Sequence, residues 1–128
     1  MVYMAEKICI DTDIIIAILK KDPQALQFIK RMTEKELYIT TITVFELLLR
    51  STHLDIVKEF IETLNILPFD TSASVKASEI YKELKEKGNL IDMRDIFIAA
   101  TAITNHCTLA TNNIKDFVRI KEVKVWKE

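Results

Sequence analysis

The chain has 128 residues, of which 49% are hydrophobic, and it contains one glycine and two prolines. This length suits one domain with its own core, the hydrophobic content excludes a disordered chain, and so few turn-forming residues argue against an all-β fold. The formal net charge is −1, which excludes strong, sequence-independent nucleic-acid binding, so any nucleic acid must be held by local cationic patches, metal or a partner chain.

Apolar runs rich in β-branched residues alternate with segments of helical periodicity along the chain. In chain order we expect a strand at 6–10, helices at 13–20 and 22–32, a strand at 37–40, a helix opened by Thr43, a helix at 54–64, an edge strand at 66–68, helices at 71–87 and 94–105, a strand at 107–110, a short helix ending near 117, and a last strand at 123–126. Alternation of this kind predicts one α/β domain over residues 1–128, with a mostly parallel sheet covered by helices on both faces.

The sequence shows neither a membrane span nor a secretion signal. The longest apolar run, residues 14–19, is far too short to cross a bilayer, and Asp11 and Asp13 interrupt any N-terminal apolar region. We therefore expect a cytoplasmic protein with no membrane attachment. Cys9 and Cys107 lie in strand-like runs; two buried thiols are the simpler interpretation, and a disulfide between neighbouring strands is the alternative.

Acidic side chains stand at the junctions between predicted strands and helices. Asp11 follows the first strand, Glu46 lies in the helix after the second strand, and Asp95 lies at the start of the apolar helix 94–105. Because the carboxyl ends of parallel strands meet at one edge of a sheet, these carboxylates should converge and repel one another unless they hold a cation. Oxygen ligands suit Mg²⁺ or Mn²⁺. The pattern therefore predicts a metal site formed by Asp11, Glu46 and Asp95.

Two of these acids also have a structural interpretation, which the sequence leaves open. Asp11 could cap the helix at 13–20, although Asp13 could do so as well, and one cap needs only one acid. Thr43 and Glu46 have the spacing of a capping box, which would place Glu46 in the first turn of its helix. Even then, Glu46 would lie beside the same edge of the sheet.

The remaining polar residues show the same ambiguity. Asp92 could cap the helix that follows, which would place Asp95 in the first turn of that helix. The rest of the helix is apolar and should be buried, so the charge of Asp95 at its start needs a partner. Asn113 and Asp116 repeat the spacing of a cap followed by an acid. Further residues that could support the site, bind phosphate or neutralise a substrate are Asp13, Thr12, Thr111, Arg50 and Arg94.

Four segments carry a resemblance that spans nearly the whole chain in order. They are residues 10–13, 42–47, 89–102 and 109–117, and the most specific pieces read Asp-x-x-Ile-Ala-Ala-x-Ala from Asp95 and Thr-x-Asn-x-x-Asp-Phe from Thr111. Together they resemble the PIN-domain family and, within it, the VapC-type toxin ribonucleases. The resemblance implies a three-layer α/β sandwich with a parallel, five-stranded central sheet.

The resemblance also implies a function. It implies Mg²⁺- or Mn²⁺-dependent hydrolysis of RNA phosphodiester bonds, a homodimer, and inhibition by a small antitoxin protein. By position it assigns the first three family acids to Asp11, Glu46 and Asp95. The fourth falls on Asn113, where many members carry Asp, which argues against a second tightly held metal unless Asp116 compensates.

Three alternatives carry less weight. The fold could serve as an inactive interaction subunit in which the acids only cap helices. Asp11-Thr12-Asp13 after a strand mimics a phosphatase of the haloacid-dehalogenase type, but one glycine cannot supply that family's later motifs. A phosphoacceptor receiver domain would need an acid at the end of a strong middle strand, and Asp70 is a poor candidate.

Overall fold

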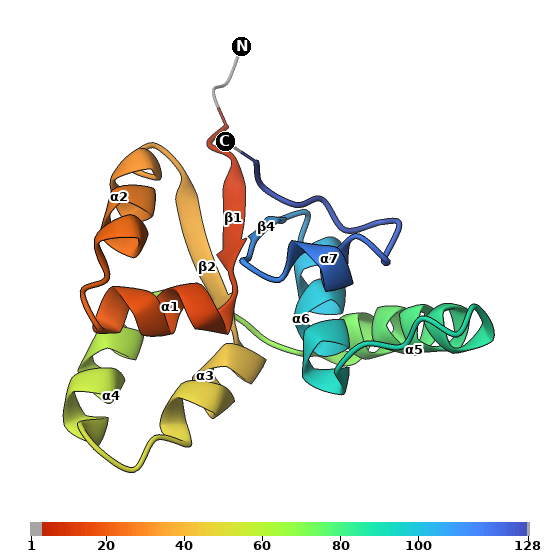
Figure 1. The fold of residues 1–128 in the computed structure, drawn as a ribbon, viewed down its shortest axis with the longest axis horizontal. Coiled ribbons are helices and arrows are strands. Elements are labelled where there is room, and N and C mark those ends of the chain that lie inside the picture. Colours follow the sequence, from red (N-terminus) through yellow and green to blue (C-terminus); the bar gives the residue numbers. More distant parts are fainter. Residues whose placement is uncertain (1–3, 128) are drawn as a thin grey trace.

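The computed structural model describes residues 4–127 and arranges them in three layers (Figure 1). A sheet lies between α1 to α4 on one face and α5, α6 and α7 on the other. The elements in chain order are β1 (Lys7–Ile10), α1 (Thr12–Leu19), α2 (Pro23–Arg31), β2 (Glu36–Thr40), α3 (Thr41–Leu48), α4 (Leu54–Glu62), β3 (Asn65–Leu67), α5 (Thr71–Glu86), α6 (Met93–Thr104), β4 (Thr108–Ala110) and α7 (Ile114–Phe117). The predicted three-layer α/β architecture is confirmed.

The sheet has the strand order β3-β2-β1-β4, and every neighbouring pair is parallel. In the register of the central strand, Cys9 lies between Tyr38 of β2 and Leu109 of β4. All carboxyl ends therefore meet at one edge, where β1 leads into α1, β2 into α3 and β4 into the loop before α7.

The expectation of a fifth strand at 123–126 is corrected by the structure. Among the described residues the sheet contains four strands, and Val125 forms only an isolated parallel bridge with Leu109. Leu109 donates to the carbonyl of Lys124 and accepts from the amide of Trp126, each at 2.8 Å. Since only Leu109 of β4 exchanges backbone hydrogen bonds with this alternating apolar segment, the two meet at one point and form no longer ladder.

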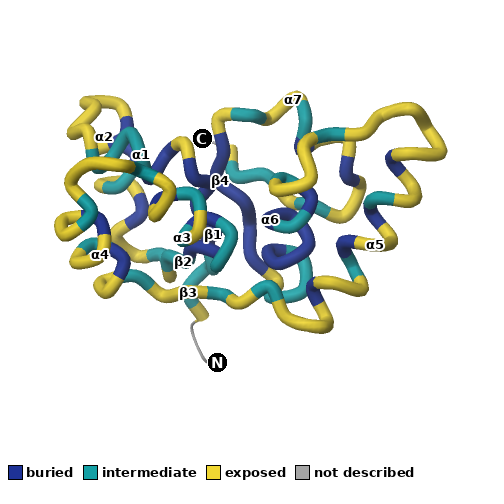
Figure 2. The backbone as a smooth tube through the Cα atoms, turned by 90° about the horizontal axis from the view of Figure 1, so that it is seen from below, coloured by how far each residue is buried: buried dark blue, intermediate teal, exposed yellow. Residues whose placement is uncertain are grey.

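The central strand is buried on both faces, as Figure 2 shows for the middle of the molecule. Ile8 and Ile10 pack with the apolar side chains of α1 to α4, whereas Cys9 packs with those of α5 and α6. Cys9 and Cys107 are both buried and free, so the disulfide alternative is wrong. Burial raises the pKa of the Cys9 thiol, which keeps it protonated and inert.

The start of α3 differs from the expected one. The helix begins at Thr41, because Thr40 is the N-cap and its hydroxyl accepts a hydrogen bond from the amide of Thr43 at 3.2 Å. The capping box of Thr43 and Glu46 is therefore not formed, and Glu46 lies in the second turn. None of the helices in the part of the chain that the structure describes is long and apolar enough to cross a bilayer.

Candidate active site

Asp11 is the buried centre of the edge where the strands end. It follows β1 as the N-cap of α1, and its amide donates to the carbonyl of Ala110, which ties the ends of β1 and β4 together at 2.9 Å. One carboxylate oxygen accepts from the amide of Thr12 at 2.8 Å and the other from the hydroxyl of Thr111 at 2.7 Å. The side chain thus has a fixed orientation.

The surroundings of Asp11 disfavour its ionised form, whereas its hydrogen bonds stabilise it. Burial raises the pKa of this carboxyl, and the charges of Asp13 and Glu46 raise it further, whereas the bonds from Thr111 and Thr12 lower it. Asp13 was a second candidate for the helix cap, but Asp11 occupies that position, and Asp13 is exposed in the first turn. Asp13 therefore contributes charge and lies outside the hydrogen-bonded cluster.

Two buried threonines connect α1 to Glu46. The hydroxyl of Thr12 donates to Oε1 of Glu46 at 2.8 Å and lies 2.9 Å from the hydroxyl of Thr43. Since the single proton of Thr12 is used on Glu46, Thr43 must donate to Thr12. The sequence predicted Thr43 only as the start of a helix and not as a partner in the site. The available signal was that Thr43 lies three residues before Glu46, which puts both on one helix face.

The first turn of α6 supplies the third acid. Asp92 is the N-cap and accepts from the amide of Arg94 at 2.8 Å, as the sequence indicated, and Asp95 lies in the first turn. Burial raises the pKa of Asp95 to about 6, and the charges of Asp11, Asp92, Glu46 and Asp116 add to this effect. Asp95 therefore faces several other carboxylates in a half-buried position.

Arg94 lies at the outer side of this cluster. Its guanidinium lies 3.6 Å from Glu46 and 3.3 Å from Asp92, and this pairing lowers the pKa of Asp92. Half of the Arg94 side chain is exposed, so it remains accessible to a negatively charged substrate. Arg50, the other cationic candidate, follows the end of α3 and takes no part in the hydrogen bonds that join the acids.

Asn113 joins the acids of α6 and α7. It occupies the N-cap position of α7 without making a side-chain cap bond. Its amide nitrogen instead donates to Asp95 at 3.3 Å and to Asp116 at 3.0 Å, while its backbone amide donates to the hydroxyl of Thr111 at 2.9 Å. A continuous path of hydrogen bonds therefore leads from Asp11 through Thr111 and Asn113 to Asp95.

Sequence and fold both match one family. The family model described as PIN domain matches residues 8–123. The chain belongs to the PIN-domain family. This assignment removes the support for the phosphatase and receiver-domain alternatives, which require other folds.

Similar proteins cover this PIN domain almost end to end. It is similar to the tRNA(fMet)-specific endonuclease VapC of Salmonella typhimurium, with 29% identity over 126 residues that span 93% of this chain and 96% of the relative. A chain in the crystal structure of DNA-bound VapBC from Salmonella typhimurium superposes with a TM-score of 0.83 at 28% identity, covering 96% of this chain and 98% of that one. For VapBC2 from Rickettsia felis, bound to a DNA fragment from its promoter, the TM-score is 0.80 at 26% identity, covering 94% and 97% of the two chains.

The donor chemistry of this PIN domain fits a hard divalent cation. Within residues 4–127, no three Asp, Glu, His or Cys side chains already lie close enough together to hold one ion. Mg²⁺ does not need such a cage, because it usually binds one or two carboxylates and keeps several waters. Asp11 and Asp95 supply these carboxylates, and each oxygen that accepts one hydrogen bond retains a second lone pair.

The Thr12 hydroxyl gives a first prediction. Thr12→Val leaves Glu46 and Thr43 without their shared partner, so the free energy of unfolding should fall by about 1–2 kcal/mol. RNA cleavage should slow several-fold because Glu46 loses its fixed orientation. Thr12→Ser keeps the hydroxyl and should behave like the natural chain in urea unfolding and in cleavage. Equal behaviour of the two variants would contradict this role.

Proposed function

We propose that this PIN domain is a metal-dependent endoribonuclease that acts as the toxin of a toxin–antitoxin pair. The observation that carries the proposal is the convergence of acids from four elements at one edge of the sheet: Asp11, Glu46, Asp95 and Asp116. Helix capping alone does not explain why these acids lie together. Asp92 already caps α6, so Asp95 is not needed as its cap, and Glu46 caps no helix. The similarity to proteins named VapC supports RNA as the substrate.

Each residue has a defined part in the proposed hydrolysis. Asp11 and Asp95 would hold Mg²⁺ or Mn²⁺, and the ion would supply positive charge to polarise the scissile phosphate and to make a water molecule more acidic. Thr111 and the Thr12 amide keep Asp11 in its orientation. Glu46, oriented by Thr12, is placed to orient the attacking water and accept its proton. Arg94 neutralises charge on the phosphate.

Asn113 and Asp116 have a supporting part. The amide of Asn113 holds the carboxylates of Asp95 and Asp116 together by donating to both. Because Asn113 itself carries no charge, we propose one tightly held ion rather than two. Asp116, which also lies 4.0 Å from Arg119, would reach that ion through water.

We further propose a cytoplasmic homodimer that is inhibited by a small antitoxin. The solved VapBC neighbours support the antitoxin partner. An apolar surface on α3 supports the homodimer: Phe45, Leu48 and Leu49 are exposed, and more than half of Phe45 and Leu49 is open to solvent. Spacings of three and four residues place them on one helix face.

The homodimer gives a second prediction. The natural chain should behave as a dimer in light scattering, and Leu49→Glu should shift it to a monomer with an unchanged fold, because a charge would be buried at the interface. Val118→Glu is the matched control, since Val118 is equally exposed on α7. A natural chain that is monomeric at all concentrations would contradict this part of the proposal.

Incubation of the purified chain with a panel of structured and unstructured RNAs tests the proposed activity. Cleavage should occur with Mg²⁺ or Mn²⁺ and stop with EDTA. If no RNA is cut and neither metal raises the melting temperature, the inactive interaction subunit becomes the better assignment. If no RNA is cut but a metal clearly raises the melting temperature, the proposed metal site is retained and the substrate is an RNA outside the panel.

A further inference from the structure

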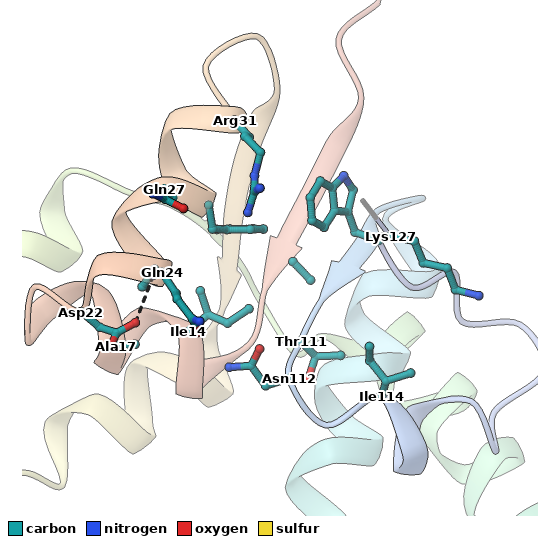
Figure 3. A pocket seen from close by; sticks show the side chains of 14 residues that line it. Ile14, Ala17, Asp22, Gln24, Gln27, Arg31, Thr111, Asn112, Ile114 and Lys127 are labelled. Carbon is teal, nitrogen blue, oxygen red and sulfur yellow. Dashed lines mark hydrogen bonds between the residues drawn. The ribbon is translucent and has the colours of Figure 1, made fainter.

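A pocket of about 620 Å³ is lined by side chains from α1, α2 and the C-terminal part of the chain, several of which Figure 3 labels. It lies between α1 and α2 on one side and the loop after β4 and the C-terminal segment on the other. Its apolar lining residues are Ile14, Ala17, Ala25, Phe28, Ala110, Ile114 and Trp126. Thr111, whose hydroxyl donates to Asp11, also lines it, so the pocket adjoins the buried acid.

The polar groups of the pocket combine amides with positive charge. Gln24 from α2 and Asn112 from the loop after β4 lie on opposite sides of it, and both side chains are exposed (Figure 3). Lys127 lines the outer part, together with Arg31. Among residues 4–127 the one carboxylate in the lining is that of Asp22, which accepts from the amide of Ala25 at 3.2 Å as the N-cap of α2 and is therefore engaged.

An aromatic pair forms one wall. The rings of Phe28 and Trp126 meet edge to face, with centroids 5.4 Å apart and an interplanar angle of 86°. Trp126 is only partly buried, so the indole presents an aromatic surface to the pocket. Proteins recognise unpaired RNA bases by stacking them on aromatic rings and by hydrogen bonds to their edges, and Asn and Gln amides match the paired donors and acceptors of a base.

We infer that this pocket binds one unpaired nucleotide of the RNA, next to the phosphate that is cleaved; this inference rests on the proposed nuclease function. Net charge of −1 gives the chain little general attraction for RNA. A pocket of this volume lies within the usual range for small-ligand sites. It supplies an aromatic surface for stacking, amides for base-edge hydrogen bonds and, in its outer part, the positive charge of Lys127. Gln24 and Asn112 would select the base, and Trp126 would stack on it.

The chain has a built-in reporter for this site, because Trp126 is its one tryptophan. The full chain carrying Asp95→Asn, which should cut RNA at least about a hundredfold more slowly than the natural chain, is titrated with fluorescein-labelled single-stranded RNA octamers of each base and of mixed sequence. Tryptophan quenching and fluorescein anisotropy should give the same dissociation constant, with a preference among the bases. Adding Gln24→Ala or Asn112→Ala should weaken binding at least about fivefold, and adding the matched exposed amide change Asn89→Ala should leave it unchanged.

The same experiment distinguishes a failure of this inference from a failure of the nuclease proposal. If anisotropy shows binding with no change at Trp126, and with equal affinity in all variants, the pocket is not a nucleotide site although the chain still binds RNA. Quenching by an unstructured peptide but by none of the RNAs would also overturn the inference and assign the pocket to a protein partner. If the natural chain neither binds nor cuts RNA with Mg²⁺ or Mn²⁺ present, and neither metal raises its melting temperature, both proposals fall.

Discussion

The Asp95→Asn chain should cleave RNA at least about a hundredfold more slowly than the natural chain in Mg²⁺, because the change removes a proposed metal ligand and not only a group that orients one. The substitution keeps the size of the side chain and an oxygen that can accept from Asn113. Without metal the variant should be at least as stable as the natural chain, since it removes a carboxylate whose ionised form is disfavoured by burial and by neighbouring acids. Cleavage rates and metal-free urea unfolding together check the prediction.

Asp92→Asn is the matched control, because Asp92 lies three residues away and its role as N-cap can be filled by Asn. This variant should cut RNA within a few-fold of the natural rate. Asp11→Asn should lose cleavage as Asp95→Asn does, because it removes the other proposed ligand. An Asp95→Asn chain that cuts RNA normally would exclude Asp95 from the active site, and equal losses in Asp92→Asn would show that the effect comes from α6 and not from one carboxylate.

Mg²⁺ should raise the melting temperature of the natural chain, and the rise should be larger at pH 7.5 than at pH 5. An acid whose pKa is raised on folding stabilises the folded state fully only below its unfolded pKa, and this contribution is lost as the pH rises through the folded pKa. For Asp95 the loss falls between its ordinary value of 3.8 and about 6. Above that pH range the carboxylates of the metal-free site repel one another fully, and a bound cation reduces this repulsion.

The size of the shift follows from mass action. At a metal concentration about a hundredfold above the dissociation constant, binding adds about 2.7 kcal/mol, which corresponds to roughly 5–10 °C for a domain of this size. Differential scanning fluorimetry with Mg²⁺ and with EDTA at the two pH values measures it. The Asp95→Asn chain should show a much smaller shift. A shift that is equal at both pH values, or larger at pH 5, would contradict the link between metal binding and ionisation of Asp95.

Local patterns were sufficient for most of the fold. The β-branched run before Asp11 and the apolar periodicity of 71–87 each depend on neighbours in sequence, and the structure has β1 and α5 there. The segment at 123–126 has an equally good strand pattern. Whether it forms a strand depends on how much of β4 it lies against once the chain has folded, so no local pattern could show that the pairing stops at one bridge.

In the candidate site, too, the sequence predicted one part and could not predict another. The acids could be named because each one stands at the end of a strand or the start of a helix. The bonds that orient them join residues far apart in the chain: Thr12 to Glu46, and Thr111 to Asp11. Thr43 was missed as a partner because its hydroxyl acts on α1 and not within α3. The bond to Glu46 follows from the packing of α1 against α3 and the bond to Asp11 from the pairing of β1 with β4, and the sequence encodes neither locally.

The position of Asp11 bears on how the proposed activity can be stopped. Asp11 directly follows the strand that is buried on both faces, and its amide is bonded to the end of β4. Fluctuations that open only a loop or fray an outer helix leave this strand intact, so the opening that displaces Asp11 is close to global unfolding. An inactive conformation that displaces Asp11 is therefore costly for the chain. Its activity would be limited by how much of it is made, how fast it is degraded, and what covers the edge of the sheet.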